Sequence, residues 1–260
     1  MAYAQANLRP IAGAVATVGV SDRVHFLRKT YGLLGIALVA WAGITAGMMR
    51  FATGTSLSFS RWAFSGQWNW ILVLVMFMVV GWIAQRLAVS QTSRALQLAG
   101  LGIFVTAEAL LLQPLLWYVM FRFGNPAEMF QAGSVQPHLS GTGASLILQA
   151  ALITLTIFIG LTVTVFVTKK DFSFMRGALA IGSFAMLGII IASAIFGFHL
   201  GALFCGFGII VLSGYILYQT SLAMSYFPPT AYVAAALMLF STVATLFWYV
   251  LQLLMSLRRD

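Results

Sequence analysis

Seven apolar stretches, each long enough or nearly long enough to cross a bilayer as a helix, constrain the fold of this chain more than any other feature. The hydrocarbon core of a bilayer is about 30 Å thick, so a helix that crosses it needs about 20 apolar residues. Inside that core every backbone polar group must be paired within the protein, which favours helices. The expected spans are 31–49, 69–83, 96–121, 143–167, 178–198, 201–224 and 231–255. The sequence therefore predicts an all-α, polytopic membrane protein with about seven transmembrane helices.

The expected domain organisation follows from these spans. Residues 1–30 are expected to form an uncleaved N-terminal tail, residues 31–256 the seven-helix membrane domain, and residues 257–260 a short C-terminal tail. The second span is short, so residues 85–87 would have to complete it, and a re-entrant segment is the alternative.

The charges are few, and they lie between the apolar stretches. Hydrophobic residues make up 61% of the chain and charged residues 7%, whereas a soluble domain carries about 25% charged residues. The net charge is +9, and we expect the basic residues that produce it to orient the helices in the membrane rather than to bind nucleic acid. On the side of the N-terminus we expect Arg9, Arg23, Arg28, Lys29, Arg86, Arg94, Lys169, Lys170 and Arg176, and on the other side Arg50, Arg61, Arg122, Arg258 and Arg259. This bias predicts that the N-terminus is inside and the C-terminus outside.

The sequence shows no pattern typical of an enzyme or a metal site. Its one cysteine, Cys205, lies inside an apolar stretch, and His138 and His199 are isolated in loops. Catalytic sites need a nucleophile beside a base, a phosphate-binding glycine loop or a cluster of metal ligands, and none of these patterns occurs. We expect no enzymatic activity, no cofactor and no metal.

Glu108 is the acidic residue that lies deepest inside an expected span. A carboxylate at the centre of a membrane helix costs ~3 kcal/mol or more, so it should be protonated, paired or hydrated. Gln113 and Pro114 follow it, and proline frees a backbone carbonyl one turn upstream, near Leu110. These features suggest a local polar cavity. Glu108 is either a sensor of protons or cations, or a neutral acid that is hydrogen-bonded to a neighbouring helix.

Two further polar features interrupt the apolar pattern. Gln219 lies in a tyrosine-rich apolar stretch, and since lipid cannot hydrogen-bond an amide, it should face other helices or a cavity. It is either a polar gate residue or a contact between helices. In residues 168–174 (TKKDFSF), Lys169 and Lys170 are expected to anchor the inner interface, while Asp171 or Ser173 caps the next helix.

Four strings in this chain resemble the Bax inhibitor-1 (transmembrane Bax inhibitor motif) family. They are VHFLRKTYGLLGIALVAWAG (24–43), TKKDFSF (168–174), LSGYILYQTSLA (212–223) and ALMLFSTVATLFWYVLQLL (236–254). The resemblance implies six helices around a central one and a role in cation homeostasis. It further implies a pH-sensitive calcium leak channel, closed by two aspartates on the sixth and seventh helices that share a proton, with help from an arginine after the second span.

This chain departs from the family pattern at both aspartate positions, which hold Gln219 and Thr242. Neither side chain titrates, so a paired-acid gate is absent, although a hydrogen bond between them could hold a similar closed packing at every pH. Arg86 or Arg94 is the candidate for the family's arginine latch. Glu108, Gln219 and Thr242 are the candidate residues of an ion pathway or sensor.

Two functions remain open. The first is a cation leak channel or ion-homeostasis protein, for which the resemblance implies calcium. The second is a non-conducting adaptor, which modulates a membrane protease or a larger membrane complex through the tail 1–30. The expected partners are the lipid bilayer, another membrane protein and calcium, and the expected location is a bacterial inner membrane.

Overall fold

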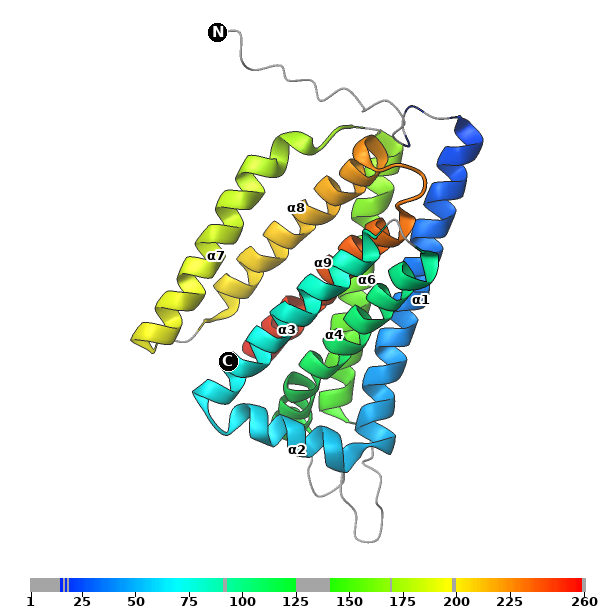
Figure 1. Ribbon diagram of the computed structural model, residues 1–260. Coiled ribbons are helices and arrows are strands. Elements are labelled where there is room, and N and C mark those ends of the chain that lie inside the picture. The colour runs from blue at the N-terminus through cyan, green and yellow to red at the C-terminus, as the bar shows by residue number, and fades with distance from the viewer. Residues whose placement is uncertain are drawn as a thin grey trace.

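The computed structural model describes residues 15, 17, 19–90, 93–124, 141–168, 170–197 and 200–258, and in these residues the regular structure is helical. The elements are α1 (Val20–Phe51), α2 (Thr53–Phe64), α3 (Gln67–Ala88), α4 (Arg94–Phe123), α6 (Thr142–Thr168), the 3₁₀ turn η1 (Ser173–Met175), α7 (Arg176–Phe196), α8 (Ala202–Tyr226) and α9 (Tyr232–Leu257) (Figure 1). Lys169, His138 and His199 lie outside the described residues.

The expected all-helical membrane fold is confirmed. Within the described residues, seven helices are long and apolar enough to cross a membrane, and each coincides with an expected span. The second of them, α3, is a continuous helix of 22 residues, so it is long enough to span rather than re-enter. The first, α1, begins at Val20, so residues 20–30 of the expected tail are helical and continuous with the first span.

One element differs from the expectation. The segment between the first two spans was expected to be a loop, but residues 53–64 form the helix α2, which lies across one end of the bundle (Figure 1). Its buried residues are Ser56, Ser60 and Ala63. Small and hydroxyl side chains thus face the protein, whereas Trp62 and Phe64 are exposed. Because this is the reverse of the usual amphipathic pattern, the sequence did not suggest a packed helix here.

The central helix of the bundle is α9. In its most apolar window 67% of the residues are buried, against 39% or less in the other spans. It packs directly against α1, α3, α4, α6 and α8, while α7 lies outside and packs on α8 (Figure 1). The expected central helix is therefore α9, and α7 departs from the simple ring of six.

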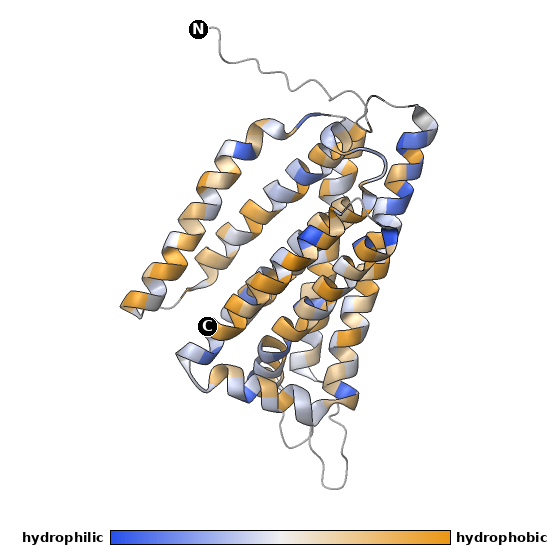
Figure 2. Cartoon of the chain, in the orientation of Figure 1, coloured by the Kyte–Doolittle hydropathy of each residue, from blue (hydrophilic) through white to orange (hydrophobic). Residues whose placement is uncertain are grey.

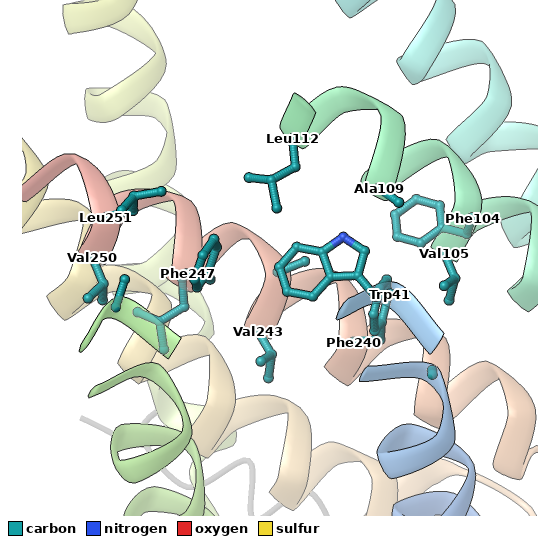
Figure 3. Close-up of a cluster of buried hydrophobic side chains, with 14 of the residues drawn as sticks. Trp41, Phe104, Val105, Ala109, Leu112, Phe240, Val243, Phe247, Val250 and Leu251 are labelled. Atoms are coloured by element: carbon teal, nitrogen blue, oxygen red, sulfur yellow. The ribbon is translucent and has the colours of Figure 1, made fainter. Parts of the chain in front are cut away.

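Aromatic side chains fill the core around α9. The indole of Trp41 on α1 meets the rings of Phe240 and Phe247 edge-on, with ring centroids 6.0 and 5.4 Å apart. Figure 3 shows Trp41 between these rings and Leu112 of α4. Edge-to-face packing of this kind stabilises aromatic pairs beyond their burial.

Glycines allow the closest helix contacts. A Cβ atom on Gly100 of α4 would lie 2.7 Å from the backbone oxygen of Ala84 and 3.0 Å from the backbone nitrogen of Ala88 on α3. On α8, a Cβ atom on Gly208 would lie 2.6 Å from the ring of Tyr249. Small residues at such crossings let membrane helices approach each other, so these two positions fix the α3–α4 and α8–α9 distances.

The two ends of the bundle differ in the helices that begin there. The N-side is the end where α1, α4, α7 and α9 begin, and the α2-side is the opposite end, where α2 lies (Figure 1). Hydrophilic residues gather at the start of α1, on the N-side, and the helix surfaces between the two ends are largely apolar (Figure 2).

Candidate functional site

The candidate site begins with a hydrogen bond between α8 and α9. The Thr242 hydroxyl donates to Oε1 of Gln219 at 2.8 Å, and it also lies 3.3 Å from the backbone oxygen of Met238 in its own helix. Thr242 is buried and Gln219 is half-buried. The two residues that the resemblance sets at the aspartate positions are therefore in direct contact.

This pair lines a cleft of about 310 Å³ on the N-side of the bundle. Gln85 from the last turn of α3 and Ser241 from α9 add polar side chains to the cleft. The other lining residues are apolar: Ala88, Val89, Phe227, Ala234, Leu237 and Met238. None of the described residues that line the cleft carries an ionisable group, so the cleft is polar but uncharged.

The structure does not bring either candidate arginine into this cleft. Arg86 is exposed, and its guanidinium lies over the ring of Trp82, 5.1 Å from the ring centre. Arg94 is exposed at the first position of α4. The polar α3 side chain in the cleft is instead that of Gln85, which precedes Arg86 and lies about 100° away around the helix.

Glu108 is buried in the middle of α4, separate from the cleft. Its side chain is 9% exposed, and no hydrogen bond or ion pair joins its carboxyl to another described residue. The helices α1, α2, α3, α6 and α9 pack against α4. Within their described ranges, α6 and α9 carry no charged residue. The charged or titratable residues of α1, α2 and α3 lie toward the ends of these helices: Asp22, Arg23, His25, Arg28, Lys29, Arg50, Arg61 and Arg86. Glu108 is therefore an isolated acid at membrane depth.

Gln113 does not share a polar cluster with Glu108, contrary to the local cavity that the sequence suggested. Its carboxamide oxygen accepts a hydrogen bond from Ser56 of α2 at 2.7 Å, and Trp117 Nε1 donates to the same Ser56 hydroxyl at 2.7 Å. The amide nitrogen of Gln113 donates to the backbone oxygen of Thr45 on α1 at 3.3 Å. This buried network joins α1, α2 and α4 on the α2-side, and no pattern in the sequence predicts the Ser56 contact.

Neither Asp171 nor Ser173 caps α7, whose N-cap residue is Met175 and has no side-chain cap; Asp171 instead contacts the start of the η1 turn and α8. Its Oδ1 atom accepts from the backbone nitrogen of Ser173 at 2.9 Å and from the hydroxyl of Ser221 at 3.1 Å. The backbone nitrogen of Phe172 donates to that same hydroxyl at 3.1 Å. The segment before α7 is thus tied to α8 near Gln219. Lys170 is exposed beside it, at the N-side.

A metal site is not formed by the part of the chain that the structure describes. No group of three or more histidine, cysteine, aspartate or glutamate side chains comes together there. Cys205 is a buried free thiol whose sulfur lies 3.8 Å from Oε1 of Gln252. The functional candidates are therefore the uncharged cleft and the isolated carboxyl of Glu108.

The chain is similar to several known proteins. A family model described as "Inhibitor of apoptosis-promoting Bax1" matches residues 23–259. Bax inhibitor 1 of Schizosaccharomyces pombe is 34% identical over 122 residues, which are 45% of this chain and 45% of that protein. The Golgi anti-apoptotic protein of Vaccinia virus (strain Lister) is 27% identical over 247 residues, covering 93% of this chain and 89% of that protein.

Protein lifeguard 4 of Mus musculus is 24% identical over 250 residues, which are 94% of this chain and 90% of that protein. The matched region of the family model includes all seven membrane-spanning helices and both residues of the Thr242–Gln219 contact. This chain belongs to the Bax inhibitor-1 family of membrane proteins.

Proposed function

We propose that this protein is a cation leak pathway of the Bax inhibitor type, with calcium as the ion to test, and that the Thr242–Gln219 hydrogen bond holds it closed. The observation that carries the proposal is the position of this bond. It joins the central helix α9 to α8 beside a polar cleft. A contact between two helices near one end of a bundle can control how far apart these helices lie.

The closing contact is uncharged, and this has a direct consequence for regulation. Two carboxylates at this distance could not both ionise, so a contact formed by an acid pair would break and re-form as the pH changes. A hydroxyl and a carboxamide keep the same hydrogen bond over the whole physiological range. We therefore propose that opening at this site responds to forces on α8 and α9, and not to protonation of the site itself.

The packing of α9 supports a closed state. Beyond the cleft, toward the α2-side, the buried residues of α9 are apolar: Val243, Ala244, Leu246, Phe247, Val250, Leu251 and Met255. A hydrated path past these side chains requires α9 to move relative to its neighbours, since close-packed apolar side chains exclude water and ions. Breaking the Thr242–Gln219 bond would favour that movement.

Glu108 is our candidate for any remaining sensitivity to pH or cations. Its carboxyl is buried at the centre of α4 without a described partner, and acids in such positions are usually functional. Movement of the neighbouring α9 would bring water to this group. The alternative is that Glu108 stays neutral and has only a structural role.

Reconstitution tests this proposal. Calcium flux into liposomes would be measured from about pH 5 to about pH 8 for the wild type and for Glu108→Gln. We expect flux in the wild type, and we expect any pH dependence to flatten in the variant. Flux that is absent at every pH would reject the leak pathway.

The second candidate function is a non-conducting adaptor for a membrane protease or a larger complex. The apolar packing beyond the cleft favours it, because the bundle as it stands offers no polar route through the described core. Deleting residues 1–22 from tagged protein should then remove a specific co-purifying membrane protein. If every partner remains bound, the tail has no such role.

We also propose that the N-side faces the cytoplasm of a bacterial inner membrane. The bias of lysine and arginine toward that side supports this orientation. The uncharged cleft would then open toward the cytoplasm. Labelling of single cysteines placed at Ser65 and at Lys170, in intact cells, distinguishes the two orientations.

A further inference from the structure

A second cavity lies between α1 and α6, away from the Thr242–Gln219 cleft. It has a volume of about 350 Å³ and a floor formed by α4 and α9. The two helices meet toward the N-side, where the ring of Tyr31 contacts those of Phe158 and Phe166. Below this contact both helices pack on α4 and α9 rather than extensively on each other. The cavity is therefore a groove that the Tyr31 contact closes at its N-side end.

The groove opens sideways, toward the region that lipid occupies. Ala42 and Ala46 of α1 and Leu155 of α6 lie on its edge and are exposed. Its lining is almost entirely apolar, and none of its described lining residues is charged. The part of a molecule that occupies this groove should therefore be uncharged and reach it from the bilayer.

Three hydrogen-bonding atoms in the groove have no hydrogen-bond partner among the residues that the structure describes. They are Nε1 of Trp41, Oγ1 of Thr45 and Oγ1 of Thr154. All three residues line the groove, and their side chains are 8%, 6% and 2% exposed. Buried tryptophan N–H and threonine hydroxyl groups usually have a partner, since an unpaired one costs about 1–3 kcal/mol. These three groups are therefore available to donate hydrogen bonds to a ligand that occupies the groove.

The chemistry of these atoms selects the ligand. An indole N–H only donates, and a threonine hydroxyl can also donate, so the complementary group is an accepting oxygen such as a carbonyl. Trp41 lies ten residues before the end of α1, about 15 Å at 1.5 Å per residue, and Thr154 lies twelve residues into α6, about 18 Å. Trp41 and Thr154 therefore lie deep in the bundle, with Thr45 about one turn nearer the α2-side, whereas the ester oxygens of a phospholipid lie at the edge of the hydrocarbon core.

We propose that the α1–α6 groove binds a small, neutral, lipid-soluble carbonyl compound of the quinone class through Trp41, Thr45 and Thr154. The carbonyl oxygens would accept from these three donors. The volume matches pockets that hold small ligands, and an isoprenoid tail would leave through the lateral opening. This proposal does not depend on whether the protein conducts ions.

The test uses the full chain in nanodiscs of one synthetic phospholipid, titrated with decylubiquinone. Binding is read from saturable quenching of tryptophan fluorescence. The variant Thr45→Val/Thr154→Val removes two hydroxyls with little change of shape and keeps all tryptophans. The control is Thr156→Val, whose exposed hydroxyl bonds the backbone oxygen of Leu152 at 2.8 Å outside the groove.

We expect the double variant to bind the probe about tenfold more weakly or worse, because two hydrogen bonds are lost, and the control to bind like the wild type. Ala151→Phe, which fills the groove, should abolish saturable binding even if the double variant does not stay monodisperse. Quenching that rises linearly and equally in all variants would overturn the proposal. So would native mass spectrometry that finds a tightly retained phospholipid and no bound probe.

Discussion

The hydroxyl of Thr242 donates a hydrogen bond to the carboxamide oxygen of Gln219 at 2.8 Å, and this bond joins the central helix α9 to α8. The family resemblance places two acids at these positions, and this chain replaces both with uncharged partners. The replacement keeps the contact between the helices and removes its ability to titrate. A closed bundle can therefore be retained while its response to pH is lost at this point.

Restoring the acids should restore a pH response. In Gln219→Asp/Thr242→Asp, the two carboxyl groups would share a proton at low pH and repel each other once both ionise. The variant should lose stability as the pH rises, whereas wild type should not show this additional loss. The melting temperature of purified protein from about pH 5 to about pH 8 measures the difference. Gln219→Glu with Thr242 intact is the control, since it carries one acid and no pair.

The crossing of α3 and α4 at Gly100 should not tolerate a methyl group. Its Cβ would lie 2.7 Å from the backbone oxygen of Ala84, and a backbone atom cannot move aside as a side chain can. We expect Gly100→Ala to cost about 1–3 kcal/mol of stability. Gly102→Ala, on the same helix with nothing within 4 Å of the new atom, should be close to neutral. Equal melting temperatures for the two variants would show that the crossing is looser than described.

The buried hydroxyl of Ser56 should stabilise the α2-side of the bundle. Removing it leaves the carboxamide oxygen of Gln113 and the indole nitrogen of Trp117 without this partner. Ser56→Ala should therefore destabilise the protein by about 1–3 kcal/mol. Ser58→Ala is the matched control, because Ser58 is exposed on the same helix. Thermal unfolding in detergent compares them, and a Ser56→Ala protein as stable as the control would contradict the network.

The carboxylate of Asp171 should slow the hydrogen exchange of backbone amides in the segment before α7. Without its carboxylate, the backbone nitrogen of Ser173 and the hydroxyl of Ser221 lose an acceptor. In Asp171→Ala we expect faster hydrogen exchange at the amides of Phe172 and Ser173, measured by mass spectrometry. Asp22→Ala, which alters an exposed acid in the first turn of α1, should leave exchange in this segment unchanged. Unchanged exchange in Asp171→Ala would mean that other contacts hold the segment.

The sequence predicted the membrane fold well, because the lengths of the apolar stretches are set by the thickness of the bilayer. It failed for α2, where the buried face consists of small and hydroxyl side chains that hydropathy does not recognise as a core. Only the packed structure shows that Ser56 meets Gln113.

Only part of the candidate site could be predicted from the sequence, because the direction of each side chain around its helix decides which residues meet. The contact between Gln219 and Thr242 is the one that the resemblance led us to expect. Glu108 and Gln113, by contrast, are five residues apart, which separates their directions by about 140° around the helix. Arg86 and Gln85 differ by about 100° in the same way, so Gln85 lines the cleft and the candidate latch Arg86 does not.

The contact between Thr242 and Gln219 can be tested directly by calcium flux into liposomes. Thr242→Val removes the hydroxyl with little change of shape, and Thr245→Val is the control, because its hydroxyl bonds only its own helix at Ser241. Loss of the bond weakens the closed state by about 1 kcal/mol, so flux should rise severalfold in Thr242→Val and stay at the wild-type level in Thr245→Val. Equal flux in all three proteins, or no flux in any of them, would contradict the role of this hydrogen bond as the closing contact.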